Sequence, residues 1–154
     1  MISSIVILVF STALFIFYIQ TLCEKVLRRE FSRAYFEDVL KAIDLEFPRL
    51  RQAVAAGLEV RYPQIRLALK SDYFTLKYLM KNGNPNQRRF SWHERLLISY
   101  FRVLFLVLPL RYALHLRESQ GVIKLTMILH HFANLVGERV MLAAEPGMSA
   151  GHQI

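Results

Sequence analysis

The sequence predicts an all-α protein in which one N-terminal transmembrane helix is followed by a small, membrane-adjacent helical body. Residues 1–23 carry no charged side chain, and apolar residues farther along recur at three- and four-residue steps, which is the helical period. The chain has 154 residues, is 54% hydrophobic and carries a formal net charge of +8. This charge suits contact with anionic lipid headgroups or an acidic partner. The single cysteine excludes an intramolecular disulfide.

Residues 1–23 are predicted to form a membrane anchor, since about 20 apolar residues are enough for a helix to cross the hydrocarbon core. No Lys or Arg precedes the apolar run, and no small-residue cleavage site follows it. We therefore favour an uncleaved anchor over the alternative, a signal peptide. The predicted membrane or partner contacts of the anchor are Ser4, Ser11, Phe15 and Tyr18: the serines allow a neighbouring span to approach closely, and Tyr18 suits the headgroup level.

Charges that flank the anchor predict its orientation. Lys25, Arg28, Arg29 and Arg33 follow the apolar run, whereas no basic side chain precedes it. The positive-inside rule then predicts that the N-terminus lies outside and that the C-terminal body is cytoplasmic. We expect a single-pass protein of a bacterial-type inner (cell) membrane. The three arginines are predicted to contact anionic headgroups. For Cys23, a partly buried thiol is favoured over a lipidation site.

Residues 24–81 are predicted to form short amphipathic helices. The first covers residues 34–47, and Pro48 should end it because the residue before a proline is pushed out of the helical region. The next helix is expected to stop near Gly57, and Pro63 to start or bound the segment that follows.

The end of this region reads as a third short helix, with Ser71 as its N-cap and Asn82 and Gly83 as its stop. Alternation over residues 65–70 is typical of a strand, but it is too isolated to build a sheet. Gly, Pro and Asn residues mark 82–90 as a loop that divides the body.

Residues 91–142 are predicted to form two longer, apolar helices. Ser91 and Glu94 have the spacing of a capping box, so the first of these helices should begin at Trp92. Pro109 is expected to kink or stop it after the preceding residue, which leaves an unbroken length too short for a comfortable span.

Three settings of this first helix are open: a core helix of the body, a helix that dips into the membrane or is buried by a partner, and a true second span. Arg95, Ser99 and Arg102 form a narrow polar stripe on an otherwise apolar surface. A span would bury Arg102 near its midpoint, so a second crossing is the least favoured setting. We expect the central helix of a membrane-adjacent body.

The second long helix begins near Val122, and residues 143–154 are predicted to be a tail that is loose unless a partner fixes it. Lys124, His131 and Glu138 are expected to line its polar side at seven-residue spacing. Its predicted apolar face consists of Leu125, Ile128, Leu129, Phe132, Leu135, Val136 and Val140.

Basic residues are concentrated in the second half of the body. The predicted membrane or partner contacts here are Arg88, Arg89, Arg95, Arg102 and Arg111. Docking against anionic headgroups is the simplest use of these charges, and a merely solvated basic face is the alternative. No nucleic-acid partner is predicted, because the aromatic residues follow apolar faces instead of alternating with basic ones.

No motif in the sequence indicates catalysis, so no enzyme, cofactor or metal is predicted. A P-loop, a Gly-rich dinucleotide turn and a nucleophile elbow are all absent. His130 and His131 diverge by about 100° on a helix and cannot ligate one metal together. Ligation of a haem or chlorophyll by a helix histidine is disfavoured against an unligated side chain.

The sequence thus predicts a non-catalytic accessory or structural subunit of a larger inner-membrane complex, either energy-converting (photosynthetic or respiratory) or transporting. Its expected partners are other membrane-protein subunits and anionic lipid headgroups. The alternative is an independent membrane-anchored scaffold that binds anionic lipid or an acidic partner. A membrane-tethered enzyme would gain support only if His130 or His131 and a carboxylate converged in one pocket.

Overall fold

The computed structural model describes residues 1–29, 31, 34–83, 89–115 and 118–144. These residues form six α-helices and no strand, so the all-α prediction is confirmed for them. Arg33, Arg88 and most of the predicted tail lie outside the described residues. The helices are α1 (Ile2–Leu27), α2 (Phe36–Ala42), α3 (Phe47–Ala55), α4 (Tyr62–Asn82), α5 (Trp92–Ala113) and α6 (Glu118–Ala144).

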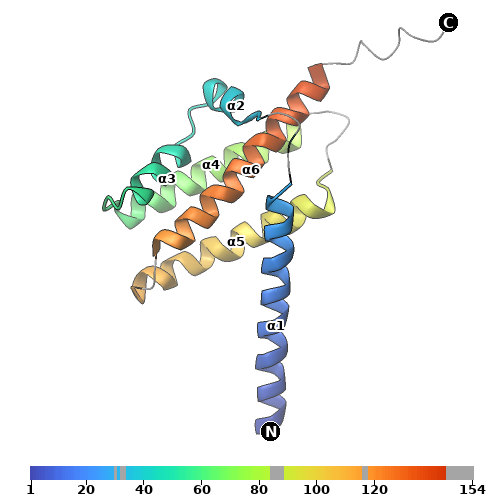
Figure 1. Ribbon diagram of the computed structural model, residues 1–154, viewed down its shortest axis with the longest axis vertical. Coiled ribbons are helices and arrows are strands. Elements are labelled where there is room, and N and C mark those ends of the chain that lie inside the picture. The colour runs from blue at the N-terminus through green and yellow to red at the C-terminus, as the bar shows by residue number, and fades with distance from the viewer. Residues whose placement is uncertain (30, 32–33, 84–88, 116–117, 145–154) are drawn as a thin grey trace, which may run out of the picture.

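Helix α1 projects from a body that the other five helices form (Figure 1). Residues 1–18 are exposed, and only the last turns of α1 pack on the core, where Cys23 is completely buried. The helix is long and apolar enough to cross a membrane, a property that a signal sequence near an N-terminus shares. It runs one turn beyond the predicted end of the anchor, to Leu27.

Helix α6 is the centre of the body and contacts each of the other five helices. Most of its predicted apolar face is buried, but two predictions for this helix are wrong. His131 is 5% exposed instead of lining a polar side, because α6 is covered on several sides and not on one. Val140 is 48% exposed, because the C-terminal end of α6 projects beyond the helices that cover its middle (Figure 1).

Pro48 starts a helix where the sequence predicted that it would end one. Helix α2 already ends at Ala42, and α3 begins at Phe47 with Pro48 in its first turn. A proline suits that turn because the first N–H groups of a helix have no partner within the helix. The Phe47 N–H instead donates to the Asp72 carboxylate of α4 at 2.6 Å, so a neighbouring helix caps α3. The predicted stop near Gly57 is confirmed, with φ of +71° at that residue.

Helix α4 is continuous from Tyr62 to Asn82, so the prediction of Ser71 as an N-cap is wrong. Pro63 lies in the first turn, as expected, and Ser71 is an exposed residue in the middle of the helix. The strand-like alternation was misleading because a longer helical period continues through it. The buried residues of α4 are Ile65, Ala68, Leu69, Asp72, Tyr73, Leu76 and Met80.

The predicted capping box of α5 is confirmed. The Glu94 N–H donates to the Ser91 hydroxyl at 3.3 Å, and the Ser91 N–H donates to the Glu94 carboxylate at 2.8 Å. The helix then continues through Pro109 to Ala113, so of the expected kink or stop, the stop is wrong. An exposed proline within a helix removes one hydrogen bond but need not end the helix.

Candidate membrane-facing surface

Helix α5 runs across the end of α1 where α1 enters the body, not alongside it (Figure 1). These two are the described helices that are long and apolar enough to cross a membrane. If α1 stands along a membrane normal, α5 is therefore strongly inclined to that normal.

One face of α5 belongs to the core of the body. Leu97, Phe101 and Leu108 are each no more than 2% exposed, and the Phe101 ring stacks on Tyr73 of α4 with 4.4 Å between the ring centres. The expectation that α5 packs in the body is thereby confirmed for this face. Only a third of its most apolar stretch is buried, however, so much apolar surface remains outside.

The opposite face of α5 changes character along its length. Its N-terminal half exposes the polar stripe of Arg95, Ser99 and Arg102. On the same side, the C-terminal half exposes apolar residues. We call these the α5 outer face, and they are Val103, Leu106, Leu110 and Leu114, each 56–73% exposed. The C-terminal end of α5 is also the end that slopes toward the free end of α1 (Figure 1). The exposed face is therefore basic in the N-terminal half of α5, close to the junction of α1 with the body. It is apolar in the C-terminal half.

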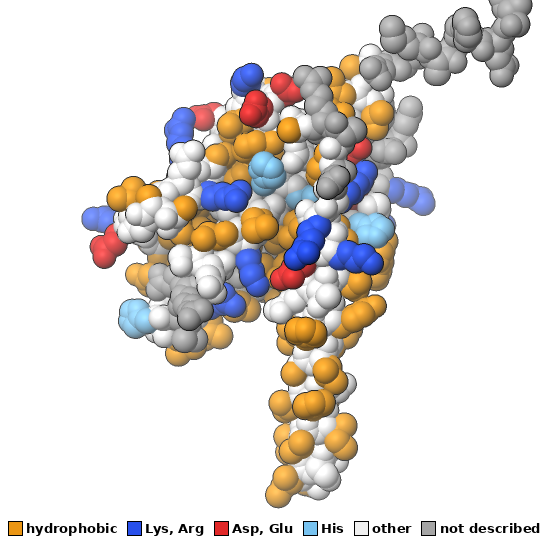
Figure 2. Space-filling view, viewed as in Figure 1, with side chains coloured by type: hydrophobic (Ala, Val, Ile, Leu, Met, Phe, Trp, Pro, Cys, Tyr) orange, Lys and Arg blue, Asp and Glu red, His pale blue; other side chains and the backbone are white. Residues whose placement is uncertain are grey.

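Basic side chains gather where α1 joins the body, whereas the projecting part of α1 is apolar (Figure 2). Arg28, Arg89, Arg95 and Arg102, four of the predicted membrane or partner contacts, are exposed. Arg111 is partly buried, with its side chain close to Gly121 of α6.

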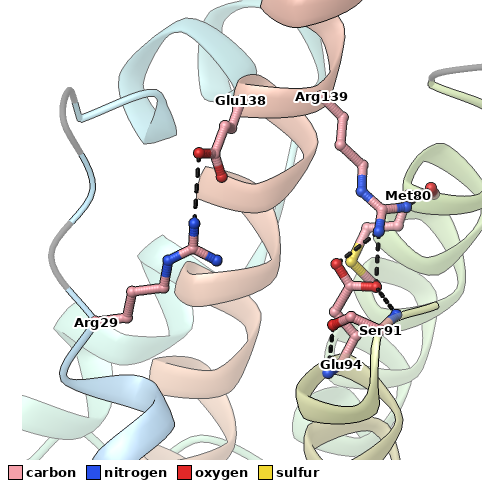
Figure 3. Close-up of polar contacts among 6 residues, drawn as sticks. All are labelled: Arg29, Met80, Ser91, Glu94, Glu138 and Arg139. Carbon is pink, nitrogen blue, oxygen red and sulfur yellow. Dashed lines mark hydrogen bonds and ion pairs between the residues drawn. The ribbon is translucent and has the colours of Figure 1, made fainter. Parts of the chain in front are cut away.

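Arg29 differs from these exposed arginines because its side chain contacts other residues of the protein. Its guanidinium is 3.6 Å from Glu138 of α6 and lies 5.5 Å from the centre of the Phe31 ring (Figure 3). It is therefore turned toward the body, although 57% of its side chain is exposed.

The predicted contacts of the anchor share one face of the projecting helix. Ser4, Ser11, Phe15 and Tyr18 are separated by steps of seven, four and three residues, and all four are exposed. They therefore form a single stripe along α1 that the body does not cover.

A buried ion pair that the sequence analysis missed joins three helices of the body (Figure 3). Arg139 of α6 donates to both oxygens of Glu94 of α5, at 2.5 and 2.6 Å, and to the Met80 carbonyl of α4. Glu94 and Arg139 are 7% and 6% exposed. Position 139 lies seven residues beyond Phe132 and so continues the buried face of α6, which is the signal that this arginine needs a buried anion.

The adjacent histidines of α6 lie against one cavity and do not face solvent separately. His130 and His131 line it together with Arg29, Arg51 and Asn134, and none of its described lining residues is a carboxylate. Burial and the Arg29 and His130 charges lower the pKa of His131 to about 4, and burial and the Arg51 charge lower that of His130. The convergence with a carboxylate that an acid–base site needs is not formed here. Among the described residues, no three His, Cys, Asp or Glu side chains are grouped as metal ligands.

Asp72 makes the folding equilibrium depend on pH. Burial raises the pKa of its carboxyl from 3.8 to about 6, and the hydrogen bond from the Phe47 N–H opposes this rise. A raised pKa means that folding favours the protonated form, so this contribution to stability is fully present below pH 3.8 and is lost as the pH rises through about 6. His131 acts in the opposite sense, because its lowered pKa gives stability above pH 6.5 that is lost as the pH falls through about 4.

The Asp72→Asn variant is expected to lack the pH-dependent stability that the raised pKa of Asp72 contributes. Between about pH 7 and pH 4, the wild type should gain free energy of unfolding relative to the variant by the order of 1–3 kcal/mol. Urea unfolding of both full-length proteins in an uncharged detergent, followed by circular dichroism, measures the difference. The contribution of His131 cancels because both proteins retain it. A difference that stays constant with pH would contradict the raised pKa.

No protein-family model, curated protein or solved structure matches this chain.

Proposed function

We propose that this chain is a non-catalytic, membrane-anchored accessory protein whose helical body rests on the bilayer surface. In this proposal α1 crosses the membrane, and the C-terminal half of α5 enters the interface between headgroups and hydrocarbon. The observation that carries it is the α5 outer face, an exposed apolar surface on a helix that runs across the end of α1. Exposed apolar patches of this kind mark sites of contact with lipid or protein.

The distribution of charge on α5 supports a resting position in the interface. Full removal of one leucine side chain from water contributes about 1.5–3 kcal/mol, so inserting several members of the α5 outer face gives a strong membrane contact. Arg95 and Arg102 precede that face, where their long side chains can extend to the headgroups while their methylene groups stay on apolar surface. Attraction of such arginines to anionic lipid adds about 1 kcal/mol for each residue near the surface.

A second crossing by α5 would require the body to come apart. To lie along the membrane normal beside α1, α5 would have to leave the contacts of Leu97, Phe101 and Leu108 with the core. It would also have to break the buried pair between Glu94 and Arg139. The resting position in the interface retains all of these contacts, which favours it over a second span.

The finer parts of the proposal concern the membrane and the partners. The basic residues that follow α1 favour a cytoplasmic body at the inner (cell) membrane. The exposed stripe of Ser4, Ser11, Phe15 and Tyr18 offers a face on which a neighbouring span can pack, which favours a structural role among other membrane-protein subunits.

Fluorescence quenching by lipid-attached nitroxides tests the resting position. A dye on Leu106→Cys, in a Cys23→Ala background and in vesicles that contain only this protein, should be quenched strongly by nitroxides just below the headgroups. The matched control is the same dye on Lys41→Cys, because α2 lies on the side of the body away from the free end of α1 (Figure 1). Equal, weak quenching at both positions would show that α5 does not touch the bilayer.

A further inference from the structure

A cavity of about 360 Å³ lies between the end of α1, helix α3 and helix α6. It is separate from the α5 outer face and shares no residue with it. Side chains from three parts of the chain meet in it, although they are far apart in the sequence. Its lining residues are Leu27, Arg29, Phe31, Arg51, Met127, His130, His131 and Asn134.

The polar lining of this cavity is dominated by hydrogen-bond donors. Arg29 and Arg51 carry guanidinium groups, which only donate. The Asn134 side-chain oxygen already accepts the Phe36 N–H at 2.8 Å, so its NH₂ group is the end left to donate. Cationic and donor groups thus converge on this cavity from α6, from α3 and from the end of α1.

Among the described residues, a carboxylate approaches this cavity at its edge. Glu138, 26% exposed in its side chain, pairs with Arg29 at 3.6 Å and is not among the described lining residues (Figure 3). Among the described residues, this one carboxylate leaves one of the two guanidinium charges unbalanced, and each imidazole ring adds an N–H donor. The described lining therefore has an excess of donors that an anion would satisfy.

The imidazole of His131 is a buried part of the cavity lining. It is 5% exposed and lies against the Phe31 ring, with 5.1 Å between the ring centres. Its neighbour His130 is held in the same way by Phe36, at 4.2 Å. Rings fixed by aromatic packing present their N–H groups in defined directions, which lowers the entropy lost when a ligand binds.

We propose that this cavity binds a phosphate group through Arg29, Arg51 and the two histidines of α6. A phosphate has several oxygens that accept hydrogen bonds from different directions, and guanidinium groups match such oxygens in pairs. The donors here come from three separate elements, which suits a tetrahedral anion better than a planar carboxylate. Either a phospholipid headgroup or a small soluble phosphate carries the same chemical group.

The two sources of phosphate differ in their relation to the membrane. The cavity adjoins Leu27, the last residue of α1, which is the level of the headgroups if α1 crosses the bilayer. The lipid source therefore rests on the proposed function, whereas the soluble source does not. Bound phosphate would also counter the lowering of the His131 pKa by Arg29, since the anion stabilises an imidazolium.

Nuclear magnetic resonance of the histidine side chains tests the proposal. The full-length protein, labelled with ¹⁵N-histidine, is titrated with inorganic phosphate in an uncharged detergent, and sodium chloride at equal ionic strength is the blank. The signals of His130 and His131 should shift with saturation, and the pKa of His131 should rise. In a second arm, nanodiscs that contain phosphatidic acid are compared with nanodiscs of phosphatidylcholine alone.

Two arginines of α3 provide a matched pair of variants. Arg51→Gln removes a lining guanidinium and should weaken phosphate binding by about tenfold, as expected for an exposed, charge-assisted contact. Arg49→Gln changes an exposed arginine that does not line the cavity and pairs with Asp44 on the surface, so it should leave binding unchanged. Neither side chain is buried, so both variants should fold.

The outcomes separate the two sources and the two proposals. Saturation by inorganic phosphate that only Arg51→Gln weakens supports a soluble source. Shifts that require phosphatidic acid, again weakened only by Arg51→Gln, support a lipid headgroup. The absence of shifts in both arms, or equal effects of the two variants, overturns the phosphate site. That result leaves the quenching at Leu106 unaffected, so the membrane position of α5 is judged separately.

Discussion

The Glu94→Gln variant is expected to lose about 3–5 kcal/mol of its free energy of unfolding, because it removes the charged carboxylate that pairs with the buried Arg139 guanidinium. Both residues are at most 7% exposed, so water cannot take over the role of the carboxylate. Glutamine is also accepted in a capping box, so the start of α5 should be preserved. The expected loss therefore reports on the ion pair that joins α4, α5 and α6.

Denaturant unfolding of the full-length protein in an uncharged detergent measures this loss. The matched control is Asp44→Asn, which removes the carboxylate of a surface pair with Arg49 at 3.5 Å, where the two side chains are 85% and 80% exposed. Such exposed pairs contribute about 1 kcal/mol or less. If the two variants lose equally little, then the pair between Glu94 and Arg139 does not hold the three helices together.

The Phe101→Ala variant is expected to lose a similar amount, about 3–5 kcal/mol, because truncation leaves a cavity where a buried ring packed. Phe101 is 2% exposed and stacks almost parallel on Tyr73, with 4° between the ring planes. This contact links α5 to α4 in the core, and a second stack, of Tyr62 on Tyr112, joins the same two helices. Its loss therefore measures how firmly α5 belongs to the body.

Leu106→Ala on the same helix is the control for this prediction. Leu106 is 73% exposed, so its truncation in detergent should change the free energy of unfolding by no more than about 0.5 kcal/mol. Unfolding is followed by circular dichroism under the same conditions for both variants. Equal losses in the two variants would contradict the burial of Phe101 on one face of α5 and the exposure of Leu106 on the other.

Local signals in the sequence were sufficient wherever a residue acts on its immediate neighbours. The spacing of Ser91 and Glu94 predicted the start of α5 correctly, because a capping box is formed within four residues. The apolar run of the first 23 residues predicted an apolar helix for the same reason, although the helix runs one turn farther. Pro48 is ambiguous locally, since proline both ends one helix and suits the first turn of another.

Tertiary contacts decided what the local signals could not. Asp72 caps α3 from 25 residues away, and Glu94 meets Arg139 across 45 residues, so neither partnership is visible in a short window. His131 was placed on a polar face because one covered side was assumed for α6. The setting of α5 depends on the steep crossing with α1, and hydropathy does not report on that geometry.

The candidate surface was therefore predicted in its composition but not in its arrangement. The exposed arginines of α5 were identified from the sequence, and Arg95 and Arg102 are exposed in the structure. The division of the exposed side into a basic half and an apolar half emerges only when the buried face is known. The cavity beside His131 depends on three elements and had no signal in the sequence.

Labelling from one side of the membrane tests most directly whether α5 rests on the bilayer or crosses it. Lys81→Cys and Leu142→Cys lie before and after α5 in the chain, and both positions are exposed. Each is placed in a Cys23→Ala background and treated with a membrane-impermeant maleimide, in intact cells and in inverted vesicles. If α5 rests on the bilayer, both cysteines react from the same side. Reaction from opposite sides would show that α5 is a second span.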